Sequence, residues 1–82
     1  MIEVTVKFFA SVRDIVGKDE YKYSLPEGAS ASDVLVRLSD EYSLFQDWKN
    51  HLRIAVNYEY VPPTHVLKNN DEVAIIPPVS GG

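Results

Sequence analysis

The residues best suited to chemistry are the last two, Gly81 and Gly82, at the end of a short tail over residues 77–82 that begins Pro77-Pro78. Because glycine has no side chain, such a tail can enter a channel that would exclude a residue with a Cβ atom. The α-carboxylate of Gly82 is then the one functional group that the tail delivers. A frayed polar end is the ordinary alternative. A strand, two prolines and a short linker before the two glycines favour the functional interpretation.

The composition is that of a small acidic globular chain without cysteine. Its 82 residues are 45% hydrophobic and 24% charged, with a net charge of −4, which suits one domain with a small core. The charge and the lack of a basic stripe argue against a nucleic-acid surface. An acidic chain is expected to meet a basic partner surface. The absence of cysteine excludes disulfides and thiolate chemistry on this chain.

The start of the chain predicts neither a signal peptide nor a transmembrane helix, because Glu3 interrupts it and no long apolar run follows. A cytoplasmic location and no membrane partner are therefore expected. We find no repeat and no internal linker, so residues 1–82 are expected to form one domain. His51 and His65 have no second ligand at metal spacing, which predicts no metal site.

The N-terminal half predicts two strands and two helices. Alternation predicts a strand over residues 2–8, after which Phe9 points to the opposite face. A short helix is expected over residues 10–16, with Ser11 as its N-cap and Gly17 as its C-terminal cap. A second strand follows over residues 20–25, with the inward residues Tyr21, Tyr23 and Leu25.

The main helix is predicted to begin after Ser30 and to continue through about Tyr42. Asp33 lies three positions after Ser30, which is a variant of the capping box. An apolar stripe at helical spacing must pack on a sheet; it consists of Val34, Leu35, Leu38 and Tyr42. Residues 43–51 are less regular, and three of them are expected to cover the edge of the core: Leu44, Phe45 and Trp48.

The C-terminal half predicts three strands. One spans residues 52–56 and ends at Asn57, which suits a left-handed turn. Residues 60–61 form a short strand at a sheet edge, because two prolines follow them. Residues 72–76 are almost continuously apolar and predict a central strand. If Val73 and Ile75 face the helix, Ile76 faces the other side together with Phe9.

This order of elements predicts an α+β fold with a mixed sheet and one main helix. The first and last strands are expected to lie side by side and parallel. That arrangement is the β-grasp, or ubiquitin-like, fold, followed here by an extended Gly-Gly tail.

Three segments resemble the MoaD/ThiS group of ubiquitin-like sulfur carriers, above all the small subunit of molybdopterin synthase. These segments are residues 6–14 with Gly17, the run Ala55-Val56-Asn57, and the C-terminal residues 71–82. The resemblance extends over the whole chain in length and element order. It is loose over residues 43–51, and Pro62-Pro63 matches no pattern of the family.

The resemblance implies a sulfur carrier of molybdenum cofactor biosynthesis. In the family, a ubiquitin-activating-like enzyme uses ATP to adenylate the terminal glycine carboxylate, and a sulfur donor protein converts it to a thiocarboxylate. Gly82 would carry that group here. The tail would enter the active site of the large synthase subunit, through residues Pro78, Val79, Ser80 and Gly81. The catalytic groups are expected on the large subunit, in an assembly of two small and two large subunits. No cofactor is expected on this chain.

The family's partner surface maps to four positions here: Phe9, Arg13, Tyr60 and Ile76. For Phe9 and Ile76 this agrees with the strand parity described above. Arg13 would otherwise be interpreted as a solvated helix residue.

Three other functions stay open. A thiamine sulfur carrier would use the same chemistry, although the segment 44–51 and the residues Pro77-Pro78-Val79 favour the molybdopterin branch. A protein modifier would join Gly82 to a lysine of a target through an isopeptide bond. A plain interaction domain with an inert tail is the third. The sequence does not distinguish molybdenum from tungsten, nor does it identify the activating enzyme.

Overall fold

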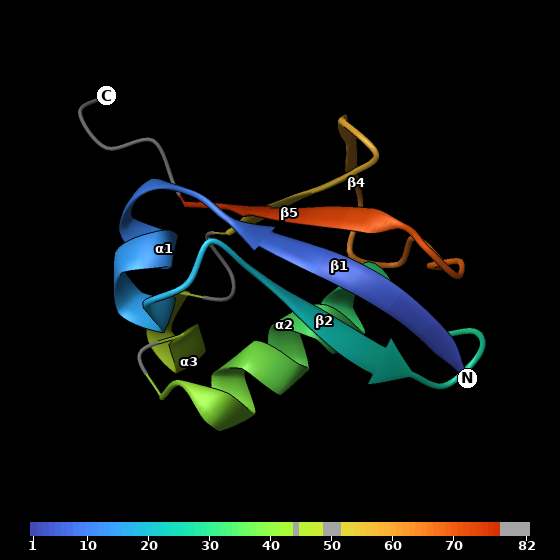
Figure 1. Ribbon diagram of the computed structural model, residues 1–82, viewed down its shortest axis with the longest axis horizontal. Helices are drawn as coiled ribbons and strands as arrows, with labels where there is room; N and C mark the ends of the chain where they lie inside the picture. The colour runs from blue at the N-terminus through green and yellow to red at the C-terminus, as the bar shows by residue number, and fades with distance from the viewer. Residues whose placement is uncertain (44, 49–51, 78–82) are drawn as a thin grey trace.

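The computed structural model describes residues 1–43, 45–48 and 52–77 (Figure 1). Within these residues, five strands form one sheet in the order β2-β1-β5-β3-β4. Strands β1 and β5 run parallel, and the other neighbouring strands are antiparallel. This is the β-grasp arrangement predicted from the sequence. The elements are β1 (Ile2–Phe8), α1 (Ala10–Val16), β2 (Glu20–Leu25), α2 (Ala31–Glu41), α3 (Phe45–Trp48), β3 (Arg53–Val56), β4 (Glu59–Val61) and β5 (Glu72–Ile76).

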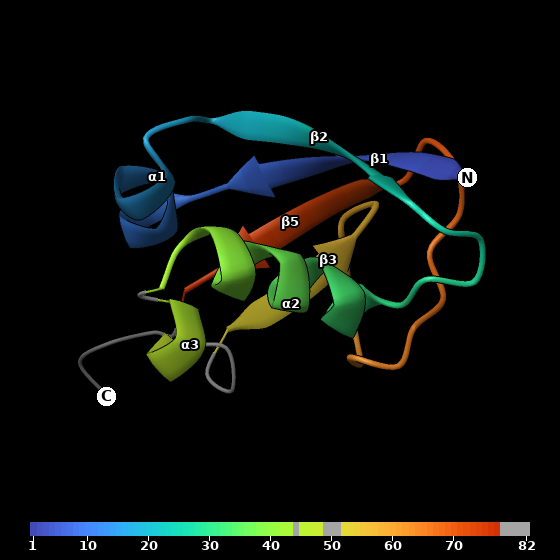
Figure 2. The same cartoon turned by 90° about the horizontal axis from the view of Figure 1, so that it is seen from below.

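Helix α2 lies across one face of the sheet and closes the core (Figures 1 and 2). The alternating residues of β1 and β5 point toward this helix, as the period-two pattern predicted. Each fully buried aliphatic side chain stabilises the fold by roughly 1.5–3 kcal/mol. Among the most deeply buried are Val4, Val6, Val34, Leu38, Val73 and Ile75, each at most 1% exposed.

The capping box at the start of α2 is confirmed. The backbone N–H of Ser30 donates to the Asp33 carboxylate at 2.8 Å. At the other end, Tyr42 is the C-cap, and its N–H donates to the carbonyl of Leu38 at 2.8 Å. The helix thus ends one residue before the predicted position. The ring of Tyr42 then meets Phe45 edge-on, at 6.0 Å between centroids.

Two sequence predictions are wrong in detail. Ser11 lies inside α1, and Phe9 occupies the N-cap position. The reason is that the chain leaves β1 through Ala10, whose φ of 51° turns it sharply into the helix. Tyr21 was expected inside but is 42% exposed. It packs against Tyr23 at 5.1 Å between ring centroids, and the ammonium of Lys18 lies 4.4 Å above its ring.

The short helix α3 was not predicted as a helix, although the core role of Phe45 is confirmed. Phe45 is fully buried beside α2. The predictions for Leu44 and His51, and for the side chain of Trp48, fall outside the described residues. Among the residues that the structure describes, no helix has the length and apolar character needed to cross a membrane.

Tyr23 links β2 to the end of α2 through a side-chain hydrogen bond. Its hydroxyl donates to Oε2 of Glu41 at 3.3 Å, and the guanidinium of Arg37 lies 5.1 Å from its ring centroid. Burial, followed by the charge of Glu41, raises the pKa of Tyr23 far above its usual range. The hydroxyl therefore stays a proton donor throughout the neutral range.

The side chain of Asn57 connects the turn between β3 and β4 to the start of β5 through hydrogen bonds. Its φ of 51° is left-handed, as predicted. Its Nδ2 donates to Oδ1 of the buried Asp71 at 3.0 Å, and its Oδ1 accepts the N–H of Glu72 at 3.0 Å. The other Asp71 oxygen accepts the N–H of Lys68 at 2.8 Å. These bonds join the last strand to the edge of the sheet.

We expect Asn57→Gly to lower the free energy of unfolding by about 1–3 kcal/mol, because it leaves a buried carboxylate oxygen without its donor. Glycine adopts the left-handed conformation without strain, so the loss reports the side-chain bonds. Asn70→Gly is the matched control, since Asn70 also has a left-handed φ, of 70°. Urea unfolding of both variants gives the comparison. Equal midpoints would show that the Asn57 side chain contributes nothing.

Candidate functional site

The last described strand, β5, leads directly to the predicted reactive tail. It lies in the middle of the sheet, between β1 and β3. Its inward residues Val73 and Ile75 are fully buried, and the chain leaves the sheet at Pro77. The tail therefore starts from a rigid base. The predicted tail residues Pro78, Val79, Ser80, Gly81 and Gly82 lie outside the described residues.

The face of the sheet opposite α2, here called the outer face, is set by the strand register. Ala55 pairs with Ala74 in β5 and with Tyr60 in β4. Arg53 pairs with Ile76, the last residue of β5. Successive residues of a strand point to opposite faces, and the residues that alternate with these face α2. The outer face therefore carries five of the paired side chains: Arg53, Ala55, Tyr60, Ala74 and Ile76.

A hollow of about 240 Å³ lies on the outer face. Two alanines line it with small side chains, whereas the aromatic residues around it are well exposed: Phe9 is 47%, Tyr60 67% and Tyr58 88% exposed. Exposed aromatic side chains around a shallow apolar hollow are typical of a protein-binding surface. The lining, here called the outer hollow, consists of Phe9, Ala55, Tyr58, Tyr60, Glu72, Ala74 and Ile76.

The carboxylate that borders the outer hollow is paired. Nζ of Lys7 lies 3.2 Å from Oε1 of Glu72. The hydrogen bond to Glu72, and then its charge, raise the pKa of Lys7. The Glu72 charge is thus largely neutralised within this chain.

The structure brings together three of the four predicted partner residues. Phe9, Tyr60 and Ile76 all line the outer hollow, and the parity predicted for Phe9 and Ile76 is confirmed. Arg13 lies apart in α1, beside a polar hollow of about 400 Å³, and its guanidinium is 3.7 Å from Asp19. Both side chains of this ion pair are exposed, so the pair contributes little to the stability of the fold. The interface role of all four residues stays a prediction.

Sequence reasoning missed the alanines and Tyr58. The alternation that placed Ile76 on the outer face also places Ala74 there, and this signal was available. The position of Ala55 depends on the β3–β5 register, which no local pattern specifies. Tyr58 occupies a left-handed turn position with φ of 72°, so its outward direction comes from the turn.

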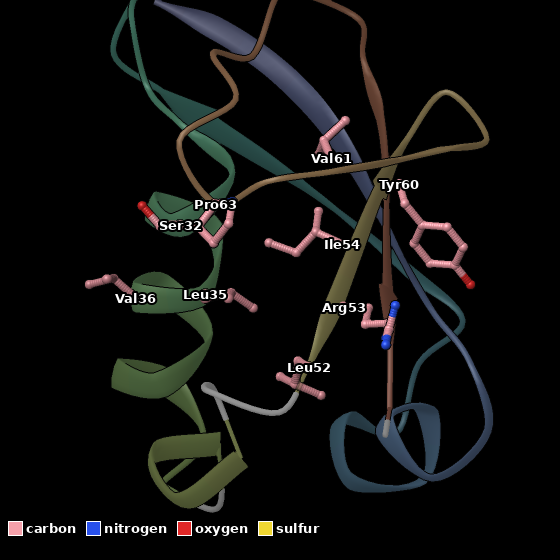
Figure 3. Close-up of a pocket in the computed structure, with 9 residues that line it drawn as sticks. All are labelled: Ser32, Leu35, Val36, Leu52, Arg53, Ile54, Tyr60, Val61 and Pro63. Atoms are coloured by element: carbon pink, nitrogen blue, oxygen red, sulfur yellow. The ribbon is translucent and has the colours of Figure 1, made fainter. Parts of the chain in front are cut away.

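A larger hollow, of about 460 Å³, lies on the other side of the sheet, between α2 and the β3–β4 pair (Figure 3). Leu35 and Ile54 point into it from opposite walls, whereas Tyr60 and Arg53 point away from α2. It includes no residue of β5, so the outer hollow is the better candidate for a site that works with the tail. Within the described residues, no group of three potential metal-binding side chains is present.

Comparison with known proteins gives consistent matches along the whole chain. A model of the ThiS family matches residues 6–82. The molybdopterin synthase sulfur carrier subunit of Chlamydomonas reinhardtii is 36% identical over 83 residues, which cover 99% of this chain and all of the relative.

Two solved structures are similar in both fold and sequence. A putative molybdopterin converting factor, subunit 1, from Pyrococcus furiosus superposes with a TM-score of 0.87 at 33% identity, covering 96% of this chain and all of that one. The small archaeal modifier protein 1 of Methanosarcina acetivorans superposes with a TM-score of 0.78, also at 33% identity. That match covers 100% of this chain and 98% of the other.

Proposed function

We propose that this chain, which belongs to the ThiS family, is a sulfur carrier of molybdopterin biosynthesis and bears its sulfur on the terminal carboxylate of Gly82. The observation that carries this proposal is the full-length similarity to a molybdopterin synthase sulfur carrier subunit. The family match extends to residue 82, so it includes the Gly-Gly end. The rigid base of the tail on β5 supports the same function.

The chemistry follows from the groups that the chain offers. A free carboxylate is a poor acyl donor, so an activating enzyme would first use ATP to form the acyl-adenylate. Sulfur at the sulfide level, delivered by a donor protein, would then attack the acyl carbon, and the bond to AMP would break to leave a thiocarboxylate. Because the chain has no cysteine, no side chain can hold a persulfide in its place. ATP and the catalytic groups would belong to the partners, and this chain would bind no cofactor itself.

The partner in sulfur transfer would be the large subunit of molybdopterin synthase. The outer hollow and the base of the tail meet at Ile76, so one partner can bind the hollow and receive the tail together. Several exposed aromatic side chains at the hollow supply the contact area that such a complex needs. Two carriers and two large subunits would form the assembly, in the cytoplasm.

Incubation with the activating enzyme, ATP and a sulfur donor should raise the mass of the chain by the difference between sulfur and oxygen. Mass spectrometry of the C-terminal peptide should place the change at Gly82, and a reaction without ATP is the control. Adding the large subunit and a pterin precursor should restore the original mass. Sulfur that reaches only a thiazole-forming enzyme would contradict the molybdopterin assignment.

Protein modification is a second candidate, favoured by the similarity to the small archaeal modifier protein 1 of Methanosarcina acetivorans. In that case the activated Gly82 carboxylate would form an amide bond with a lysine of a target. The same experiment separates the two functions. A mass increase equal to a whole target protein, without sulfur transfer, would assign the chain to modification.

A further inference from the structure

Arg53 occupies a special position on the outer face. It pairs with Ile76 across the β3–β5 ladder, so it lies beside the last strand residue before the tail. Its side chain is exposed, whereas the next residue, Ile54, is buried against α2. A partner that contacts the end of β5 would therefore lie close to this guanidinium.

The ring of Tyr60 lies beside the Arg53 guanidinium. The guanidinium carbon lies 5.9 Å from the centroid of the Tyr60 ring. Figure 3 shows the two side chains next to each other, both directed away from α2. A cation near an aromatic ring at an exposed site gains roughly 0.5–1 kcal/mol. The contact leaves the N–H groups of Arg53 available for another acceptor.

The charges around the outer hollow do not neutralise Arg53. The ion pairs found within residues 1–43, 45–48 and 52–77 are Lys7–Glu72 and Arg13–Asp19, and neither includes Arg53. Glu72 is already engaged by Lys7. Among the described residues, Arg53 is therefore an exposed positive charge without an ion-pair partner next to the outer hollow, although the whole chain has a net charge of −4.

We infer that Arg53 is a specificity-determining residue of this face, which binds a carboxylate that the partner presents beside the point where the tail enters. The planar guanidinium can bind both oxygens of a carboxylate, which fixes orientation as well as charge. The net charge of the chain predicted a basic partner surface, whereas next to Arg53 we expect the partner to be acidic. The inference rests on the proposed function, because it takes the large subunit of molybdopterin synthase as the partner.

The test compares Arg53→Glu with Lys22→Glu. Both substitutions reverse one exposed positive charge on the outer face, but Lys22 belongs to β2, at the far edge of the sheet. Binding to the large subunit is measured at several salt concentrations. Arg53→Glu should weaken binding by roughly tenfold or more at low salt, with the deficit shrinking as salt is added. Lys22→Glu should bind nearly as well as the wild type.

Arg53→Gln provides a second variant that removes the charge without reversing it, and thermal melts of all variants verify folding. Equal binding by Arg53→Glu, Arg53→Gln and the wild type would overturn the inference while leaving the sulfur carrier function intact. Equal losses in Arg53→Glu and Lys22→Glu would overturn it as well, because the effect would then follow net charge. A wild-type chain that gains no sulfur and binds no large subunit would overturn both the proposed function and this inference.

Discussion

Deletion of Gly82 should abolish sulfur transfer and leave the free energy of unfolding unchanged. The last core residue that the structure describes is Ile75, and glycine has no side chain to bury, so we expect the deletion to remove no core packing. The new terminal carboxylate would belong to Gly81, and in a tail that is extended in the partner's channel it would fall about 3.5 Å short of the original position, which is the length of one extended residue. Since displacement of a reacting group by about 1 Å can lower a rate roughly a hundredfold, activity should fall below detection.

Thermal melts and an assay of molybdopterin formation give the two measurements. Ser80→Ala is the control, because it changes the tail but keeps its length and both glycines. Gly81→Leu keeps the length and the carboxylate yet adds a side chain, and it should lose activity by blocking the channel. Wild-type activity from the chain without Gly82 would end the sulfur carrier proposal.

Replacing Phe9 with aspartate should separate binding from folding. In the complex, an unpaired carboxylate at the outer hollow would disfavour binding by roughly 3 kcal/mol or more, which raises Kd at least about a hundredfold. In the free domain, Phe9 is nearly half exposed and occupies the N-cap of α1 without a side-chain cap. Aspartate is a favoured N-cap residue, so the capping gain offsets the lost packing.

Calorimetric titration with the large subunit and urea unfolding of the free domain measure the two effects. Val36→Asp is the matched control, since Val36 is 51% exposed and lies on α2, away from the outer face. It should leave binding unchanged. If Phe9→Asp unfolds the free domain and shows no separate binding defect, Phe9 belongs to the core and the outer hollow is not the partner surface.

The sequence was most informative where the local pattern and the tertiary structure agree. Alternation in residues 2–8 is sufficient to orient β1, because its inward side is covered from end to end. The prolines after Val61 mark β4 as an edge strand for a purely covalent reason, the missing N–H of proline. Tyr21 has the correct parity but lies where α2 no longer covers the sheet, and that coverage is a tertiary property. Helix α3 has only four residues, too few for a helical period to show.

The candidate site was predictable only in part, for a related reason. Phe9 and Ile76 are large apolar residues whose parity could be counted along their own strands. Ala55 and Ala74 are 19 positions apart in the printed sequence, and their small side chains carry no pattern. Only the antiparallel register of β3 and β5 brings them together. The same register places Arg53 opposite Ile76, at the end of β5.

The parallel pairing of β1 with β5 also has a mechanical consequence. The tail follows β5 in the sequence, so a partner that draws the tail along the direction of β5 would pull on this strand along its own axis. Force in that direction shears β5 against its two neighbours, β1 and β3. The hydrogen bonds of both ladders must then break together. Strands peeled from an edge lose their bonds one at a time and separate at lower force. If the chain has the proposed function, this strand arrangement would let a partner pull on the tail without unfolding the domain.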